Sequence, residues 1–248
     1  MDRPIYRYLA DKHWRSYRRL IVMQRLSQMS VVPDLLQSID LTADVRIAFG
    51  RRNVQSGDFV ESRVSEHPAK LRVQVFDKGE RLVSIVVVDP DVPDVAGEKF
   101  DFRCHFVAVN VPISPTTTSV PFTSTTVQER TVLPWLPPWA QKGTPYHRLA
   151  FFVLQQPEGE VFDVSALKEK LHRDGFNLRS FIDKYKMRAI GANIFRAKWD
   201  EGTPGVMARA GIEGADTEFK RLRTGPTKTP QEPLKKKKNI RGLPSKRV

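Results

Sequence analysis

Apolar residues recur at short intervals along the middle of the chain, from about residue 41 to residue 205. Within residues 70–76, Leu71, Val73 and Val75 alternate with polar residues, which is the period of a half-buried strand. Similar short segments separated by polar breaks indicate a mainly β domain with antiparallel strands, in which residues 77–80 form a hairpin turn. These further segments lie at residues 45–49, 59–64, 82–88, 102–111, 149–154 and 189–198.

The run at residues 82–88 is the most apolar of these segments, and its mostly β-branched composition predicts a strand buried on both faces. Pro90 and Pro93 follow, and because proline has no N–H we expect the strand to end at Asp89. The strand would then deliver two carboxylates, Asp89 and Asp91, to its rim.

A helical period appears in other parts of the chain. Near the N-terminus, Trp14, Tyr17 and Ile21 fall at i, i+3 and i+7, which predicts a helix with a partner-facing stripe. Residues 165–174 and 178–186 are also predicted helices, separated by Gly175. Residues 112–128 and 133–139 are rich in proline and predicted to be irregular.

Charge divides the chain into three parts. The net charge of +13 consists of +5 in residues 1–30 (seven Lys/Arg, two Asp), −2 in residues 31–218 (23 Lys/Arg, 25 Asp/Glu) and +10 in residues 219–248 (eleven Lys/Arg, one Glu). We therefore predict a helical basic N-terminal extension (1–40), a near-neutral β domain (41–205) and an extended basic C-terminal tail (206–248). Basic arms of this kind serve a polyanion, either nucleic acid or an anionic membrane surface.

Aromatic residues interleave with arginines in the N-terminal arm, a combination that suits RNA. The alternative is a helix packed on its own domain with solvated arginines. Under the RNA interpretation the phosphate contacts come from both arms and position the protein without reading sequence. The candidate RNA-binding residues are Arg15, Arg18, Arg19, Lys235, Lys236, Lys237, Lys238 and Arg241.

Several classes of protein do not fit the composition. The single cysteine, Cys104, rules out an internal disulfide, and no apolar run is long enough for a membrane span or a secretory signal. The first stretch is Arg-rich like a mitochondrial presequence, but Asp2 and Asp11 make it a poor example; the alternative is that a presequence is missing from this chain.

Polar residues beside the predicted strands form a candidate anion pocket. Imidazole N–H groups would donate to a phosphate-type head group and an aspartate would fix the tautomer; the alternative is that these residues are rim turns and satisfied core polar groups. No H-x-x-x-H or C-x-x-C spacing supports a metal, and no G-x-S-x-G motif supports a nucleophile, so we expect no cofactor and no enzymatic activity. The pocket residues are Asp89, Asp91, Pro93, His105, His147 and Arg148.

Four motifs together carry a family resemblance: VVVDPDVPD (86–94), CHFVAVNVP (104–112), GTPYHRLAFFVLQQ (143–156) and FNLRSFIDKYKMRAIGANIFRAKWDE (176–201). Over residues 60–201 the chain resembles the phosphatidylethanolamine-binding protein family. The resemblance implies an antiparallel β-sandwich with a small anion pocket at one end, to which Asp89, Pro93, His105 and His147 correspond. Two departures are Leu149 after the His-Arg pair and Trp139 in the pocket wall, and a bulky tryptophan there argues against binding of a lipid head group.

The terminal motifs narrow the resemblance. HRLAF (147–151), RPIYRYLADKHWRSYRRL (3–20) and the long basic tail are similar to members of this family in the mitochondrial large ribosomal subunit of fungi. This resemblance implies a structural ribosomal protein of the mitochondrial matrix, at the central protuberance, in contact with rRNA and neighbouring ribosomal proteins. The alternative is a soluble module that binds an anionic ligand or phospholipid head group, or a signalling regulator.

Overall fold

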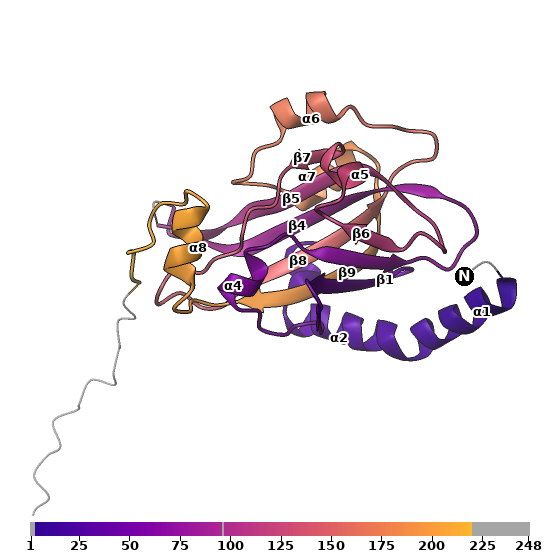
Figure 1. The fold of residues 1–248 in the computed structure, drawn as a ribbon, viewed down its shortest axis with the longest axis horizontal. Helices are drawn as coiled ribbons and strands as arrows, with labels where there is room; N and C mark the ends of the chain where they lie inside the picture. The colour runs from indigo at the N-terminus through magenta and orange to yellow at the C-terminus, as the bar shows by residue number, and fades with distance from the viewer. Residues whose placement is uncertain (1–2, 96, 220–248) are drawn as a thin grey trace, which may run out of the picture.

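The computed structural model describes residues 3–95 and 97–219, and its centre is a sandwich of two antiparallel sheets (Figure 1). A four-stranded sheet has the order β2-β1-β3-β6, and a five-stranded sheet has the order β7-β5-β4-β8-β9. This architecture confirms the predicted mainly β fold. The strands are β1 (Asp44–Phe49), β2 (Arg52–Val54), β3 (Lys70–Gln74), β4 (Arg81–Asp94), β5 (Lys99–Ile113), β6 (Ser119–Pro121), β7 (Thr131–Leu133), β8 (His147–Gln155) and β9 (Arg188–Ala197).

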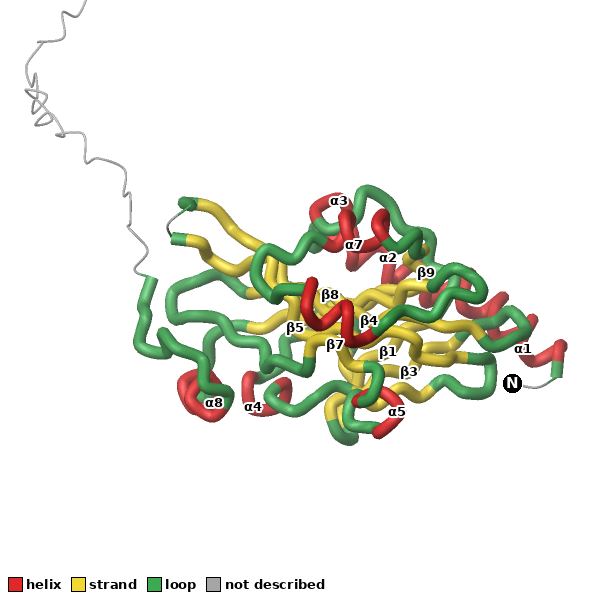
Figure 2. The backbone as a smooth tube through the Cα atoms, turned by 90° about the horizontal axis from the view of Figure 1, so that it is seen from above, coloured by secondary structure: helices red, strands yellow, loops and turns green. Residues whose placement is uncertain are grey.

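Helices lie around the sandwich rather than within it (Figures 1 and 2). The longest helical element is at the N-terminus, where a π-helical segment joins two α-helices. The helical elements are α1 (Pro4–His13), η1 (Trp14–Arg18), α2 (Arg19–Gln28), α3 (Val31–Asp34), α4 (Ser62–Ser65), α5 (Thr125–Gln128), α6 (Val164–Lys170), α7 (Leu178–Lys184) and α8 (Thr203–Arg209).

The five-stranded sheet is buried on both faces, which explains the apolar run in β4. Val87 and its neighbours on one face pack between the sheets, whereas Val86 and Val88 face a second core beneath helices. Trp14 and Leu26 from the N-terminal helix belong to that second core. The four-stranded sheet has only its inner face in the core, so its strands alternate between apolar and polar residues.

The π-helical segment determines which side chains of the N-terminal helix share its buried face. Two turns of α-helix take about 7.2 residues, and the extra residue of a π-helical turn lengthens this to about eight, which is the spacing of Trp14 and Val22. Both side chains are therefore buried on the same face, followed by Leu26 one turn later. Tyr17 and Ile21 are exposed, so the predicted stripe of Trp14, Tyr17 and Ile21 does not form one face.

Three further predictions about local structure were wrong. Residues 59–64 are not a strand, because only Phe59 forms a bridge, to Arg196, before α4 begins. Residues 77–80 are not a hairpin turn, because β3 and β4 belong to different sheets and the segment crosses between them. Residues 112–128 are not wholly irregular, since they include β6 and α5.

β4 also continues beyond the point where the prolines were expected to end it. Asp89 pairs with Arg103 and Val92 pairs with Asp101, so two residues of β4 stand opposite the single residue Phe102 of β5, which makes a bulge with one extra residue on β4. Because the bulge needs no ladder hydrogen bond from Pro90, the strand resumes and runs on to Asp94. The paired ends of β4 and β5 extend beyond the rest of the sheet in Figure 2.

Helix α8 crosses the boundary that we predicted at residue 205. Val206 and Met207 are buried, and the guanidinium of Arg209 forms a bidentate ion pair with the carboxylate of Glu66, the residue after α4. The chain then remains described to residue 219, and residues 220–248 of the predicted tail lie outside the described residues.

Candidate functional site

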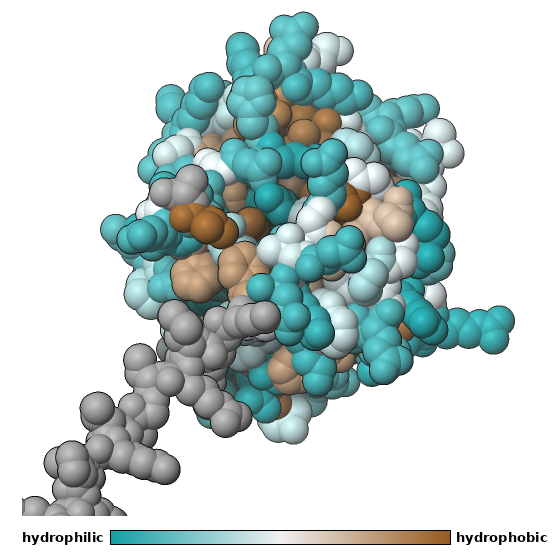
Figure 3. Space-filling model, turned by 90° about the vertical axis from the view of Figure 1, so that its left-hand side faces the viewer, coloured by the Kyte–Doolittle hydropathy of each residue, from teal (hydrophilic) through white to brown (hydrophobic). Residues whose placement is uncertain are grey.

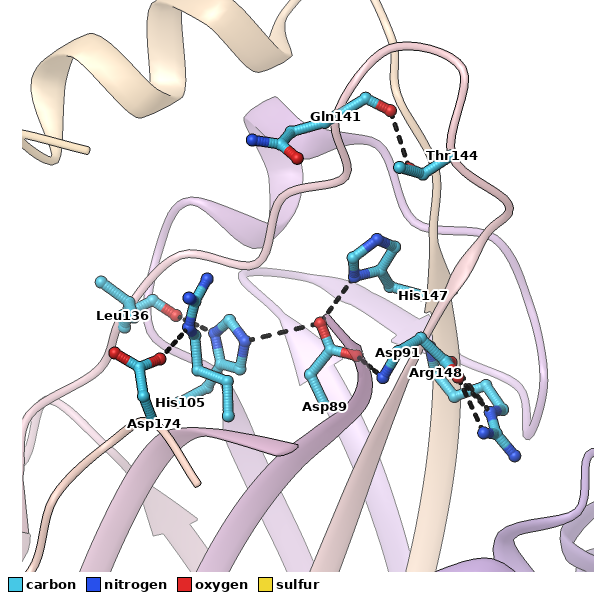
Figure 4. A network of polar contacts seen from close by, with 10 residues as sticks. Asp89, Asp91, His105, Leu136, Gln141, Thr144, His147, Arg148 and Asp174 are labelled. Carbon is cyan, nitrogen blue, oxygen red and sulfur yellow. Dashed lines mark hydrogen bonds and ion pairs between the residues drawn. The ribbon is translucent and has the colours of Figure 1, made fainter. Parts of the chain in front are cut away.

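The bulge in β4 places Asp89 at the mouth of the core, where its carboxylate is almost wholly buried. One oxygen, Oδ1, accepts a hydrogen bond of 2.9 Å from the backbone N–H of Asp91. The other oxygen, Oδ2, lies between two imidazole rings, those of His105 from β5 and His147 from β8 (Figure 4). One buried carboxylate therefore serves both histidines of the predicted pocket.

His147 and Asp89 form a buried ion pair. The Nδ1–H of His147 donates to Oδ2 of Asp89 at 2.7 Å. Burial opposes the imidazolium charge, but the charge of Asp89 and this hydrogen bond outweigh it and raise the pKa of His147. Burial likewise opposes the charge on Asp89, and the charge and hydrogen bond of His147 hold the pKa of that carboxyl below its usual value.

The pKa of His105 shifts in the opposite direction to that of His147. Nδ1 of His105 lies 2.9 Å from the carbonyl oxygen of Leu136, which only accepts, so Nδ1 carries the proton. Burial lowers the pKa of His105 to about 4, although the nearby Asp89 carboxylate opposes that shift. The ring is therefore neutral near pH 7, with the lone pair of Nε2 at 3.9 Å from Asp89 Oδ2.

A bulge also decides which way His105 faces. Simple alternation would place Cys104 and Phe106 on one face and His105 on the other. Instead, a register shift between Val87 and Val88 leaves Cys104 in the core beneath the helices and Phe106 in the core between the sheets. His105 thereby reaches the same end of the sandwich as Asp89.

Asp91 and Arg148 form a second pair, which does not join the histidine site. The Arg148 guanidinium binds both oxygens of Asp91, with Nη2 at 2.7 Å from Oδ1 and Nε at 2.8 Å from Oδ2. Its Nη1 donates to Asp34 Oδ2 and to the carbonyl oxygen of Met29, each at 2.8 Å. Arg148 therefore fastens the N-terminal extension to the rim of the β domain.

A cavity of about 180 Å³ opens beside Asp89 and the two histidines. Pro93 lines it as predicted, and Trp139 forms part of the wall, edge-on to His105 with ring centres 5.7 Å apart. Since the cavity persists beside it, Trp139 narrows the site without filling it. Of the six predicted pocket residues, the structure brings four together here: Asp89, Pro93, His105 and His147.

Sequence reasoning missed five residues of the cavity wall, one of which is Val92 on β4. Arg103 is the cross-strand partner of Asp89, and its guanidinium lies 4.7 Å from the centre of the Trp139 ring. Its place two residues before His105 was a signal that could have found it. Gln141, Ile212 and Glu213 also line the cavity, but they come from loops whose positions no local pattern predicts.

The cavity can accept hydrogen bonds and donate them. Nε2 of His105 and Nε2 of His147 are buried and have no hydrogen-bond partner within the described residues. Neutral His105 presents an acceptor there, and His147 presents an N–H donor when it is protonated, a combination suited to a small, partly protonated anion. Among the described residues no cluster of three or more His, Cys, Asp or Glu could hold a metal ion.

Next to this cavity, apolar surface gathers at the end of the sandwich where β4 and β5 turn (Figure 3). Phe100 and Tyr146 are exposed there and line a second cavity of about 280 Å³ together with the Asp91–Arg148 pair.

The structure also places the candidate RNA-binding residues of the N-terminal arm. Arg15 pairs with Asp11 one turn away and stays largely exposed. Arg18 and Arg19 reach the β domain and its leading segment instead, where they pair with Asp44 and Asp40. The remaining candidates lie outside the described residues: Lys235, Lys236, Lys237, Lys238 and Arg241.

Comparisons with known proteins show which family shares this sequence and fold. A family model described as phosphatidylethanolamine-binding protein matches residues 40–195. The large ribosomal subunit protein mL38 of Schizosaccharomyces pombe is 27% identical over 210 residues, which cover 83% of this chain and 66% of that protein. The chain therefore spans slightly less than two thirds of that relative's length.

Two further relatives represent the family more widely. The protein TERMINAL FLOWER 1 of Arabidopsis thaliana is 25% identical over 176 residues, or 70% of this chain and 89% of that one. A phosphatidylethanolamine-binding protein from Plasmodium vivax has a similar fold, with a TM-score of 0.54 and 17% identity over 72% of this chain and 98% of that chain. The family model covers well over half of the sequence, and the β-sandwich has the fold of the solved family member: the chain belongs to the phosphatidylethanolamine-binding protein family.

Proposed function

We propose that this protein is a non-enzymatic structural constituent of the mitochondrial large ribosomal subunit, held in place by rRNA and neighbouring ribosomal proteins at its basic terminal arms. The observation that carries the proposal is the extent of the similarity to the S. pombe ribosomal protein. Eighty-three per cent of 248 residues is about 206 residues, whereas the family model spans only 156, from 40 to 195. About 50 matched residues therefore lie outside residues 40–195, and the match covers more of this chain than the 72% covered by the P. vivax family member.

The N-terminal extension supports this proposal because it is built into the fold. Arg148 binds it at Met29 and Asp34, and Arg179 donates to the carbonyl oxygens of Pro33, Asp34 and Leu35. Such anchoring holds the helix in a defined position, as a permanent assembly requires.

The free end of the extension has a surface that suits an assembly. None of the residues of α1 is buried, and Ile5, Tyr8 and Leu9 lie within one turn at 52–62% exposure. A basic helix with exposed aromatic and aliphatic side chains offers contacts to both RNA and protein. Within the described residues no helix is long and apolar enough to cross a membrane.

Co-sedimentation tests the proposal. The full chain, tagged and expressed in mitochondria, is expected to sediment with large ribosomal subunits on a sucrose gradient at low salt. Removal of residues 219–248, which carry a net charge of +10, should weaken that association and make it more sensitive to salt. A chain that stays at the top of the gradient at low salt contradicts the proposal.

A second candidate function, binding of a small anion, is favoured by the Nε2 atoms of His105 and His147 in the cavity, which have no hydrogen-bond partner among residues 3–95 and 97–219. The volume of about 180 Å³ equals that of about six water molecules in the liquid, which is enough for a phosphate group. Titration with inorganic phosphate and with phosphoethanolamine, followed by the NMR signals of His105 and His147, tests this candidate. Spectra that stay unchanged at millimolar ligand would exclude it.

A further inference from the structure

The outer face of the four-stranded sheet carries a row of positive charges that the terminal arms do not account for. Arg46 of β1 stands directly opposite Arg72 of β3, and Lys70 lies two residues from Arg72 on the same face. All three side chains are exposed. Arg18 reaches the same place from the N-terminal helix, and the four cations line one groove of about 320 Å³.

Electrostatic repulsion between Arg46 and Arg72 destabilises the four-stranded sheet. Like charges directly opposite each other on neighbouring strands destabilise the pair, so the placement of Arg46 against Arg72 calls for a compensating anion. Asp44 provides only part of that compensation: its buried carboxylate binds Arg46 at 2.8 Å and Arg18 at 3.2 Å. Among the described residues, Lys70 and Arg72 have no carboxylate partner, so the groove keeps a charge of +3 after Asp44 is counted.

The remaining groove residues indicate what kind of anion fits. Asn53 and Gln55 are exposed amides, whose N–H groups can donate to phosphate and ribose oxygens. None of the described residues that line the groove has an aromatic ring on which a base could stack. Cations that follow one another across two strands and a helix suit a chain of phosphates better than a single ion. Duplex RNA is recognised in this way, through phosphates and 2′-hydroxyls.

We propose that this groove, formed by Arg18, Arg46, Lys70 and Arg72, binds the phosphate backbone of an RNA duplex. The inference rests on the proposed ribosomal function and adds a third RNA contact, on the β domain itself. The N-terminal helix is part of the site, because it supplies Arg18 to the groove. Contacts of this type position the sandwich against RNA without reading its sequence.

The variant Lys70→Gln/Arg72→Gln tests the groove, because it breaks no ion pair of the described structure and relieves the repulsion of Arg46. A matched control is Lys168→Gln/Lys170→Gln on α6, which removes two exposed charges on the far side of the sandwich. Full chains are titrated into a labelled RNA duplex of about two helical turns, followed by fluorescence anisotropy at several salt concentrations. The groove variant is expected to bind at least five-fold more weakly, with a salt slope lower by about 1.5, and to melt at no lower temperature than the parent chain.

A local measurement accompanies the affinities. Acetylation of Lys70 in the full chain, quantified by mass spectrometry, should slow several-fold when the RNA duplex is bound, whereas acetylation of Lys170 should not. Unchanged affinity of the groove variant, or equal reactivity of Lys70 in free and RNA-bound chains, overturns the inference. Protection of Lys70 by anionic phosphatidylglycerol vesicles and not by RNA overturns it as well and assigns the groove to a membrane surface.

The outcome is separable from that of the proposed function. A chain that sediments with large subunits while its groove variant keeps full RNA affinity overturns the groove alone. A chain that stays out of the subunits, yet binds duplex RNA through Lys70 and Arg72, supports the groove and contradicts the ribosomal assignment.

Discussion

Asp89 and Asp91 stand two residues apart on β4, yet their carboxylates bind consecutive residues of β8 that face opposite sides of the sheet. Asp89 holds His147 on the cavity side, and Asp91 holds Arg148 on the side of the N-terminal extension. In a regular strand both aspartates would share one face, and the bulge between Asp89 and Val92 separates them. One short motif thus builds the cavity and anchors the extension.

The buried pair of Asp89 and His147 contributes to stability. Asp89→Asn removes the carboxylate charge while keeping the size of the side chain, so His147 loses its ionic partner inside the core. We expect the free energy of unfolding in guanidinium to fall by about 2–4 kcal/mol. The control is Asp174→Asn, whose partner is Arg103 and whose carboxylate is 72% exposed; this change should cost less than about 1 kcal/mol. Equal losses in the two variants would contradict a special role for the buried pair.

His105 predicts a loss of stability on acidification. Its folded pKa of about 4 lies below the unfolded value of 6.5, so its unfolded form binds the proton more readily. Stability is therefore full above pH 6.5 and decreases as the pH falls towards 4, by on the order of 3 kcal/mol. In His105→Gln, the free energy of unfolding from denaturant titrations should fall less between pH 7 and pH 4.5 than in the parent chain. An equal fall in the two proteins would show that other groups cause the loss of stability.

His147 serves as the comparison because its shift has the opposite sign. Its folded pKa is raised by Asp89, so its contribution is present below pH 6.5 and is lost as the pH rises through the folded pKa. His147→Gln should therefore change how the free energy of unfolding depends on pH above 6.5, whereas His105→Gln should not.

Arg148 is expected to control the attachment of the N-terminal extension. Arg148→Ala removes its contacts to Asp91, Asp34 and the Met29 carbonyl together, so we expect hydrogen exchange at residues 29–36 to accelerate at least ten-fold. Arg148→Lys should restore only part of the protection, because an ammonium cannot bind Asp91 with two parallel hydrogen bonds. Arg188→Ala, which removes an exposed 3.5 Å pair with Asp40, is the matched control and should leave that segment unchanged.

Cys104 should report on global unfolding. Its thiol is fully buried on the helix side of β5, and burial raises its pKa to about 12. We expect no reaction with a disulfide reagent at pH 8 in the native protein and complete reaction in denaturant. A native-state rate that does not slow when the protein is stabilised would show that the thiol is reached by local opening instead.

Local patterns were sufficient for the existence of most strands. The apolar run that became β4 and the alternation that became β3 each indicate burial directly, because side-chain period and burial are linked in a strand. The prediction for residues 59–64 was wrong because their alternation resembles a strand, whereas within the described part of the chain only Phe59 forms a bridge. The sequence could not distinguish a hairpin at residues 77–80 from a crossover between sheets, since both need only a polar turn.

The sequence by itself determined the β-rich domain, the charged arms and the residue types of the site, including Asp89, His105 and His147. These follow from composition and from periods of a few residues. Only the tertiary structure decided that Asp91 and Arg148 leave the cavity for the extension, that Trp14 turns inward, and that Arg46 meets Arg72. Each of these depends on a bulge, a π-helical turn or a cross-strand register, which join residues far apart in the chain and leave no local period to detect.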